Sequence, residues 1–358
     1  MLQSMRHTLA GLVLAAGSLT IVSAQAPPAN AEIYRRAVQT YVRIGNPAAA
    51  VKPLVGWSKA DLDLVVADTI ARANPEEMEA AAMLHLEIGV ALAGISTPSS
   101  AGYLDMGSRL VDGLVPTNPD VRRNLNAQRV EEIATIRSTW LGVAGSAFLS
   151  VNDVVRARPL FTKALKITPK SAALLTLLGA ADEIDGAINN PNDVESLAMQ
   201  RRVTQQRTRL LLSAEQLYRQ ALTADPGYAL AQIRLGRVEF LFKNMKAAAV
   251  SLKKGSDAAQ DPSHRYLAAM FTGALLQEQK DLDGARVQFE RALEIAPQSQ
   301  NAIVALAYVE LISGRPDHAQ TLTRGYLGAP NSDEGWWAFK NGTLDHAGLN
   351  WLRKRVRK

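Results

Sequence analysis

The stretch GALLQEQKDLDGARVQFERALEIAP, residues 273–297, decides the fold, because its pattern of small, aromatic and proline residues returns elsewhere in the chain. Steps of twelve, four, three and five residues lead from its first glycine to its last proline. These residues are Gly273, Ala285, Phe289, Ala292 and Pro297. Residues 145–169 carry the same types at the same spacing, namely Gly145, Ala157, Phe161, Ala164 and Pro169. Such agreement indicates an internal repeat.

The period of this repeat is 34 residues, since that step leads from Gly145 to Gly179 and from Gly273 to Ala307. The second half of the repeat returns in a third copy, which consists of Ala214, Tyr218, Ala221 and Pro226. A fourth, looser copy consists of Gly236, Ala248, Leu252 and Gly255, with Pro262 two residues late. Several consecutive units of one size predict a chain of stacked, similar modules.

Each residue type in the pattern suits a close pair of antiparallel helices. A glycine or alanine lets two helices cross closely, and the aromatic residue fills the space between neighbouring units. Ala285, Phe289 and Ala292 are followed by Leu293, and together they form one stripe of an α-helix. The proline ends the second helix, because it lacks a backbone N–H and its ring obstructs a further turn.

This spacing resembles the tetratricopeptide repeat, a helix-turn-helix unit of 34 residues. The resemblance covers residues 138–328, roughly half of the chain. It implies an all-α fold, an α-solenoid in which the helix pairs form a right-handed superhelix. The first helix of each pair would line a concave groove. Proteins of this family usually hold peptides or protein segments, so the resemblance also implies a protein-binding role.

One repeat is longer than the others. After Gly179 the matching second half begins only at Ala214, so 23 extra residues intervene. The insertion, residues 188–211, contains an asparagine-rich loop and then a segment of helical character. Four arginines lie in that segment: Arg201, Arg202, Arg207 and Arg209. Long loops without structure are uncommon in compact folds, so we expect the insertion to lengthen the two flanking helices. A long loop inside one repeat is the alternative.

The regions beside the repeats are also predicted to be helical. In residues 30–137, the patterns predict helices at 31–45, 59–73, 76–94 and 102–114. Gly89 and Ala101 stand twelve residues apart, which predicts a degenerate repeat that caps the start of the solenoid. Residues 329–358 end in a predicted helix that places Leu344, Gly348 and Trp351 on one face. We expect this helix to cap the last repeat, and an aromatic docking surface is the alternative.

Residues 1–24 have the pattern of a secretory signal peptide. Arg6 precedes an uncharged apolar core at 9–22, and Ser23 and Ala24 supply small residues at the expected cleavage site. The core of roughly 14 residues is shorter than the roughly 20 that span a bilayer, which disfavours a membrane anchor. The chain has no cysteine, so an exported form would be stabilised without disulfides. We expect an exported bacterial protein, periplasmic or extracellular.

Reactive constellations are absent from the sequence. Its five histidines, at positions 7, 85, 264, 318 and 346, include no pair at the spacing of a helical metal site. We expect His85 to be packed in an alanine-rich helix. No phosphate-binding loop, nucleophile elbow or dinucleotide fingerprint occurs. The net charge of +6 is only mildly basic. We therefore predict no catalytic residue, no cofactor, no metal site and no nucleic-acid partner.

The sequence and the resemblance together indicate a non-catalytic protein–protein interaction scaffold of the bacterial cell envelope. The resemblance places seven residues of the first helices in the groove, and most of them are apolar. They are Ile233, Arg237, Phe240, Met270, Val304, Tyr308 and Leu311. We expect a peptide or protein segment to bind there. The alternative is that a neighbouring helix covers these residues.

Two further functions remain open from the sequence. The first is adhesion to an anionic polymer or membrane surface through a basic C-terminal tail, which consists of Arg353, Lys354, Arg355, Arg357 and Lys358. These cations could equally be a solvated tail that offsets the negative end of the helix macrodipole. The second is a role as non-catalytic subunit of an envelope enzyme or secretion complex.

Overall fold

The structure is a computed structural model, and it describes residues 28–72, 74–92, 97–113, 127–150, 152–188 and 196–324. These residues are helical and contain no β-strand, which confirms the predicted all-α class. The chain divides between Pro169 and Lys170 into two compact units. The predicted signal peptide and residues 329–358 lie outside the described residues. Within the described ranges, no helix is both long enough and apolar enough to span a lipid bilayer.

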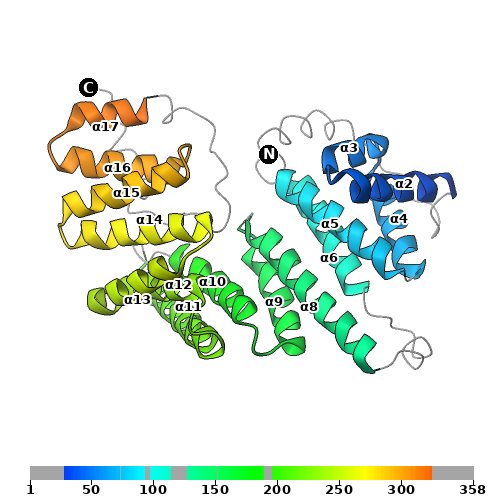
Figure 1. Ribbon diagram of the computed structural model, residues 1–358, viewed down its shortest axis with the longest axis horizontal. Helices are drawn as coiled ribbons and strands as arrows, with labels where there is room; N and C mark the ends of the chain where they lie inside the picture. The colour runs from blue at the N-terminus through cyan, green and yellow to red at the C-terminus, as the bar shows by residue number, and fades with distance from the viewer. Residues whose placement is uncertain are drawn as a thin grey trace. The chain divides into compact units, whose positions relative to one another are not determined.

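Unit 1 begins with a group of shorter helices and continues in two antiparallel helix pairs, α5 with α6 and α8 with α9 (Figure 1, blue to green). Its elements are α2 (Pro28–Ile44), α3 (Pro47–Val51), the 3₁₀ turn η1 (Lys52–Leu54), α4 (Lys59–Arg72), α5 (Pro75–Leu92), α6 (Thr97–Gly113), α8 (Ala127–Ser150) and α9 (Val154–Ile167). The boundary predicted between residues 137 and 138 falls inside α8.

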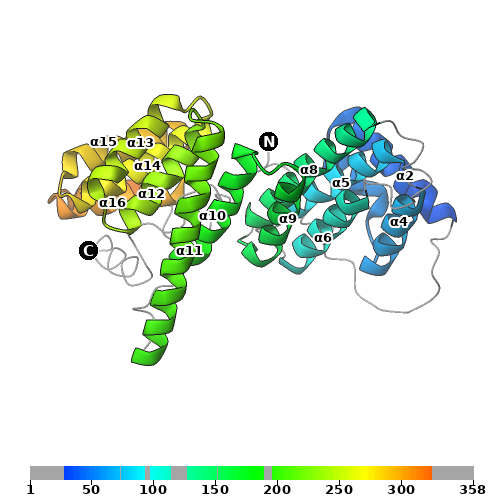
Figure 2. The same cartoon turned by 90° about the horizontal axis from the view of Figure 1, so that it is seen from below.

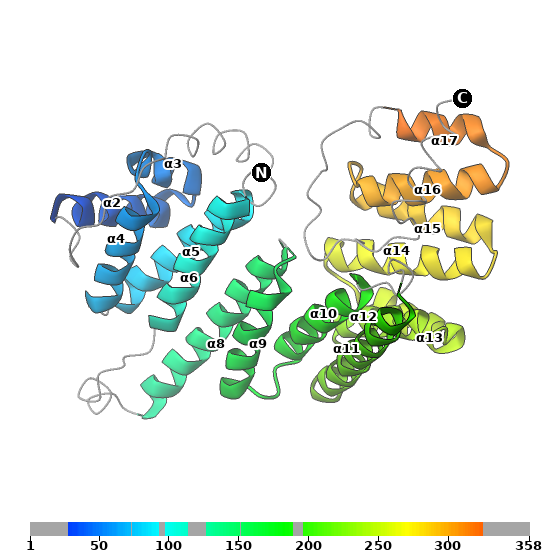
Figure 3. The same cartoon turned by 180° about the vertical axis from the view of Figure 1, so that it is seen from behind.

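Unit 2 consists of four helix pairs in chain order, and α14 to α17 lie side by side in both views of this unit (Figures 1 and 3). Its helices are α10 (Ala172–Ile188), α11 (Leu197–Ala224), α12 (Ala229–Leu241), α13 (Met245–Ala258), α14 (Pro262–Glu278), α15 (Leu282–Ile295), α16 (Gln300–Ile312) and α17 (Pro316–Thr323). The first helix of each pair also contacts the second helix of the pair before it.

The glycines of the repeat mark the points where paired helices cross. A methyl group on Gly273 would lie 2.5 Å from the ring of Phe289, and Gly145 stands in the same relation to Phe161. Opposite Gly236 the corresponding place is filled by Leu252, 2.7 Å from such a methyl group. The large side chain therefore occupies the volume that a Cβ atom would need. This packing explains why a small residue and a large one recur sixteen residues apart.

A second regularity sits in the turn between the two helices of a pair. Seven residues after the crossing residue the backbone is left-handed, at Asn152, Lys243, Lys280 and Gly314, with φ of 61°, 62°, 67° and 79°. The next residue caps the second helix, as Asp281 does by accepting a hydrogen bond from the Gly284 backbone N–H at 2.9 Å. A left-handed residue followed by a capping side chain reverses the chain within a few residues.

The insertion lengthens both flanking helices, the second far more than the first. The second helix α11 has 28 residues, whereas α13 and α15 have 14 each. The first helix α10 ends nine residues after its crossing glycine, whereas α12, α14 and α16 end five residues after theirs. Tyr218 nevertheless packs against Gly179 as Phe161 does against Gly145, 23 residues later than the regular spacing. The extension is therefore about one turn in α10 and several turns in α11.

In the pair α5–α6, where the sequence predicts a degenerate repeat, the second helix is one residue out of the predicted register. Leu104, not a residue sixteen positions on, lies opposite Gly89, 2.6 Å from a methyl group placed there. Ser100 is buried and donates a hydrogen bond to the Gly89 carbonyl at 2.7 Å, while Ala101 is partly exposed. Ser100 therefore has the position that the spacing gives to Ala101. Ala101 lies outside the helix contact because the step from Gly89 to its large neighbour Leu104 is fifteen residues instead of sixteen.

Candidate binding surface of unit 2

The first helices of unit 2 share a face of charged and aromatic side chains, called here the first-helix face. Its members are Glu183 of α10, Arg234 and Arg237 of α12, Phe271 of α14 and Tyr308 of α16. Arg234 and Phe271 stand two residues before the crossing residue of their pair, and Arg237 and Tyr308 stand one residue after it. These positions lie about 100–160° around the helix from the crossing residue, so they point away from the second helix of their own pair.

A buried ionic cluster forms the centre of this face. The guanidinium of Arg234 donates to Glu183 Oε1 at 3.1 Å, and Arg237 Nε lies 3.9 Å from the same oxygen. The Tyr218 hydroxyl donates to the other carboxylate oxygen at 2.7 Å. The Arg237 guanidinium also lies over the ring of Phe271, 4.7 Å from its centroid. The cluster thus ties three successive helix pairs together.

Burial sets the electrostatics of the cluster. The exposed fractions of Glu183, Arg234 and Arg237 are only 3%, 2% and 5%. Burial is the largest cause that lowers the pKa of Arg237 to about 10; the positive charges of Arg234 and Arg207 lower it further, and Glu183 opposes them. Burial and the Glu183 charge hold the pKa of Tyr218 well above its usual value, so its hydroxyl stays protonated and donates.

Two of the predicted groove residues belong to the core. Ile233 and Met270 are fully buried, and both stand three residues before the crossing residue of their helix. Ile233 faces the second helix of its own pair, since a methyl group on Gly255 would lie 2.5 Å from Ile233 Cγ1. Three residues are almost a full turn, so this position stays on the side of the helix that packs. These two side chains are enclosed rather than offered to a partner.

The other predicted residues divide between two places. Arg237 and Tyr308 lie on the first-helix face, the first buried and the second partly exposed. Val304 and Leu311 are partly exposed and pack on the small cluster where α16 meets α17. Phe240 is partly buried at the end of α12, where Lys243 Nζ lies 5.7 Å from its ring centroid. Of the seven predicted residues, only Arg237 and Tyr308 have the helical offset of the first-helix face.

Sequence reasoning missed Glu183, Arg234 and Phe271. A signal for two of them is present in the repeat, because Arg234 and Phe271 stand at the same offset from Gly236 and Gly273. Glu183 has no such counterpart, and its role appears only when α10 and α12 lie side by side. As a result the surface is richer in charge than the mainly apolar wall that the sequence predicts.

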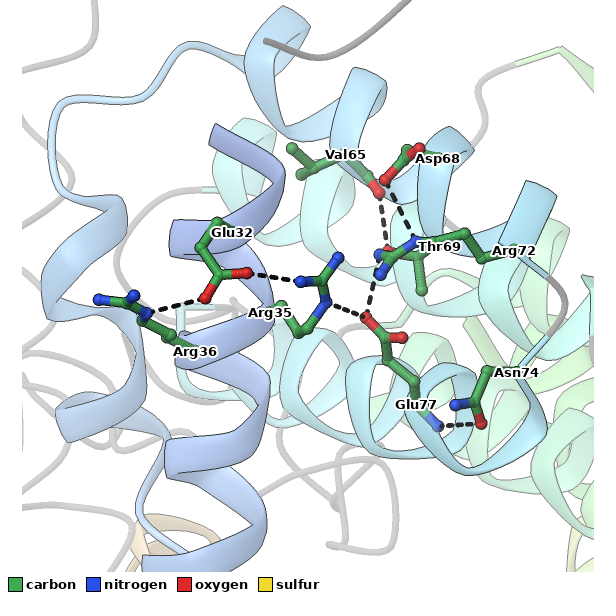
Figure 4. A network of polar contacts seen from close by, with 9 residues as sticks. All are labelled: Glu32, Arg35, Arg36, Val65, Asp68, Thr69, Arg72, Asn74 and Glu77. Atoms are coloured by element: carbon green, nitrogen blue, oxygen red, sulfur yellow. Dashed lines mark hydrogen bonds and ion pairs between the residues drawn. The ribbon is translucent and has the colours of Figure 1, made fainter. Parts of the chain in front are cut away.

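A polar network in unit 1 connects α2, α4 and α5 (Figure 4). Arg72 of α4 lies with Nη2 2.9 Å from Glu77 Oε1 and with Nε 3.2 Å from Asp68. Arg35 of α2 approaches the same Glu77 at 3.9 Å and also pairs with Glu32. All of these charges are neutralised by one another, which indicates that the network clamps three helices rather than serving a ligand.

His85 also has a structural position in unit 1. Its exposed fraction is 1%, and its Nε2 lies 2.8 Å from the Tyr34 hydroxyl. The Tyr103 ring lies on its other side, with a centroid distance of 5.5 Å. Burial lowers the pKa of His85 to about 3, so the imidazole is neutral near pH 7. The prediction that His85 is packed is confirmed.

Comparisons with known proteins give similarity of structure only. No protein-family model matches the sequence, and no curated protein matches it. The chain is similar to TTC0263, a thermophilic TPR protein of Thermus thermophilus, at 20% identity and a TM-score of 0.40, covering 64% of this chain and 100% of that one. It is similar to PilF of Pseudomonas aeruginosa at 16% identity and a TM-score of 0.41, covering 70% of this chain and 95% of that one. It is similar to an IFIT1 mutant solved with m7Gppp-AAAA at 15% identity and a TM-score of 0.46, covering 91% of this chain and 71% of that one.

These TM-scores lie below 0.5, so the assignment depends on the chain's own repeats. The crossing glycine with its large neighbour and the left-handed turn occur together in α8–α9, α12–α13 and α14–α15, while α10–α11 has the crossing contact and α16–α17 has the turn. Among the described residues, no three acidic or histidine side chains gather closely enough to hold a metal ion. The helix pairs from α8–α9 to α16–α17 resemble tetratricopeptide repeats in their spacing and packing, and the described fold is an all-α solenoid.

Proposed function

We propose that this chain is a non-catalytic protein-interaction scaffold of the bacterial cell envelope and that the first-helix face of unit 2 receives a peptide or protein segment. One observation carries the proposal: Glu183, Arg234, Arg237 and Phe271 of three successive first helices meet in one cluster, and Tyr308 has on α16 the same offset from the crossing residue that Arg237 has on α12. Arginine and aromatic residues are the types enriched at protein interfaces, because they combine large contact area with directional polar groups.

The face offers two kinds of contact. Tyr308 supplies an aromatic ring with a polar hydroxyl, and it is partly exposed at the end of the unit that the structure describes. The buried Glu183–Arg234–Arg237 cluster gives the neighbouring surface a fixed charge pattern, because its members are held by one another. A segment with an apolar side chain for Tyr308 and polar groups toward α12 suits this arrangement.

A photo-crosslinking experiment tests the location of binding. A photoreactive amino acid would replace Tyr308 in one variant and Val287 in a control variant, and both would be exposed to envelope extracts. Val287 is 54% exposed on α15, a second helix, so the control is accessible but off the proposed face. We expect a defined protein to crosslink at position 308 and not at 287. Equal crosslinking at both positions would contradict the proposal.

Export is a separate part of the proposal, supported by the charge, apolar core and Ala24 of the first 24 residues. N-terminal sequencing of the protein recovered from the envelope fraction would test it. We expect the mature chain to begin at Gln25. A recovered chain that still begins at Met1 would contradict the compartment without affecting the binding face.

The second candidate function is adhesion to an anionic surface through the basic tail, favoured by five cations within residues 353–358. Binding of that kind weakens steeply with added salt, because exposed charges are screened beyond about 8 Å at physiological ionic strength. Removal of residues 353–358 should then abolish binding to vesicles that contain anionic lipid. Binding through the first-helix face should survive that deletion.

A further inference from the structure

The long helix α11 carries a surface that the scaffold does not use. Near its middle α11 packs on the end of α10, since a methyl group on Gly186 would lie 3.2 Å from Leu210 Cβ and 3.4 Å from the Arg207 carbonyl. Because α10 ends two residues later at Ile188, the first part of α11 extends beyond its partner. Figure 2 shows α11 running well past the other helices of unit 2.

This extending part is strongly basic. It contains four arginines and no acidic residue between Leu197 and Ala214. Within the described part of the chain none of these four arginines forms an ion pair, whereas Arg219 farther along the same helix pairs with Glu215 at 2.7 Å. Unpaired arginines on an exposed helix repel one another, so this surface gains more from an acidic partner than from water alone.

The charges lie along one line of the helix. Arg202, Gln205, Arg209 and Leu212 follow at spacings of three, four and three residues, and we call this line the arginine stripe. All four residues are exposed, Leu212 by 53%. The core contacts of α11 come from the opposite side, through Leu211, Ala214, Tyr218 and Ala221. The stripe therefore faces outward, and its two arginines are two helical turns apart, about 10 Å.

We propose that the arginine stripe is a second docking surface, which binds an acidic helix of a partner protein whose carboxylates are two turns apart. Guanidinium groups pair bidentately with carboxylates, and Leu212 adds an apolar contact at one end. A second copy of this chain is disfavoured, because pairing two stripes would place arginine against arginine. A membrane is disfavoured because the stripe contains a single apolar side chain.

The stripe is placed on Arg202 and Arg209 for a further reason. The sequence carries Asp193 and Glu195 directly before α11, outside the described residues. Arg202 and Arg209 lie one to three turns beyond the start of α11 at Leu197, and no acidic residue stands within five positions of either along the chain. This surface is separate from the first-helix face and does not depend on the proposed function.

A designed peptide can test the stripe with the full chain. The probe is a helical peptide with glutamate and leucine alternating at spacings of three and four residues, and the matched peptide has glutamine in place of glutamate. Fluorescence anisotropy would measure binding to the wild type and to Arg202→Glu/Arg209→Glu. We expect the charge reversal to weaken binding of the glutamate peptide at least tenfold. A lysine version of the peptide should bind the reversed variant and not the wild type.

The control makes the same change in net charge elsewhere. Lys246→Glu/Arg291→Glu alters exposed cations on α13 and α15 and should change affinity less than twofold. Arg202→Gln/Arg209→Gln should lose affinity for the glutamate peptide without a reversal of charge, and circular dichroism would verify that each variant is folded.

Equal losses of affinity for this peptide in the control and stripe variants would overturn the proposal, as would an unchanged affinity in the stripe variants. Binding of phosphatidylglycerol vesicles but not of the peptide would assign the stripe to a membrane instead. Tyr308→Ala should leave peptide binding to the stripe unchanged, which separates the two surfaces.

Discussion

Gly273, the crossing glycine of the third helix pair of unit 2, allows a quantitative test of the packing. In Gly273→Ala the new methyl group would lie 2.5, 2.8 and 2.9 Å from three atoms of the Phe289 ring. Carbon atoms do not approach so closely, and the ring is fully buried, so the helices must move apart. The substitution therefore forces strain exactly where two helices meet in the repeat.

The expected size follows from two opposed effects. Overpacking of a core costs about 1–3 kcal/mol, while alanine in place of glycine inside a helix gains about 1 kcal/mol. Because three ring atoms are involved and none is the free end of a flexible chain, the strain belongs at the upper limit. We expect the free energy of unfolding of unit 2 to fall by about 2 kcal/mol.

Urea unfolding followed by circular dichroism would measure the change, with Gly102→Ala as the matched control. Gly102 also lies inside a helix, but a methyl group there would meet nothing within 4 Å. The control should therefore raise the stability of unit 1 by up to about 1 kcal/mol. If Gly273→Ala is as stable as the wild type, the close crossing at this glycine is refuted.

The chain itself suggests a rescue. In the last described pair the crossing residue is Ala307, and sixteen residues later stands Thr323, whose hydroxyl bonds to the Ala319 carbonyl at 2.9 Å. Gly273→Ala combined with Phe289→Thr would reproduce this combination. Its loss of stability should be smaller than the sum of the two single losses, because the smaller side chain leaves room for the methyl group.

Three other predictions concern the interior of the two units. Glu183→Gln should destabilise unit 2 by about 3 kcal/mol in denaturant unfolding, because it removes the buried carboxylate that Arg234 contacts. Ala292→Trp should lower the melting temperature markedly, because Ala292 is buried. Glu294→Gln changes an exposed residue and should alter the free energy of unfolding by no more than about 0.5 kcal/mol. Equal shifts in melting temperature for the two variants would contradict the repeat register. The low pKa of His85, about 3 against an ordinary 6.5, makes unit 1 fully stabilised above pH 6.5. The free energy of unfolding of unit 1 should fall as pH falls from 6.5 toward 3, by up to about 1.4 kcal/mol per pH unit. Thermal unfolding measured at a series of pH values should show this dependence in the wild type and not in His85→Gln.

The repeat region could be predicted because its packing depends on small and large residues at a fixed spacing. Gly273 and Phe289 interlock in space, and a single fixed spacing expresses that interlock in the sequence. The same rule located Tyr218 opposite Gly179 despite 23 additional residues, since the size pattern resumed after the insertion. It failed by one residue in the pair α5–α6, because that pair is one residue shorter and Ser100 takes the alanine position, where its hydroxyl donates to the Gly89 carbonyl.

The binding surface could be predicted only in part. Spacing identifies which residues share a helix face, and the crossing residue marks the face that turns toward the second helix. Ile233 and Met270 stand three residues before the crossing residue, on the packing side, and are buried. The Glu183–Arg234 pair joins residues 51 positions apart, and such a contact between successive first helices leaves no local pattern. Its position follows from the stacking of the pairs and not from any one repeat.

The most direct test of the scaffold function is the affinity of a crosslinked partner for three forms of the full chain over a range of salt concentrations. These forms are the wild type, Tyr308→Ala and a chain without residues 353–358. An aromatic anchor at an interface contributes about 2 kcal/mol or more, so Tyr308→Ala should lose at least tenfold in affinity, with little dependence on salt. The deletion should bind as the wild type does. An affinity that survives Tyr308→Ala but disappears with the tail, or at moderate salt, would contradict binding at the first-helix face.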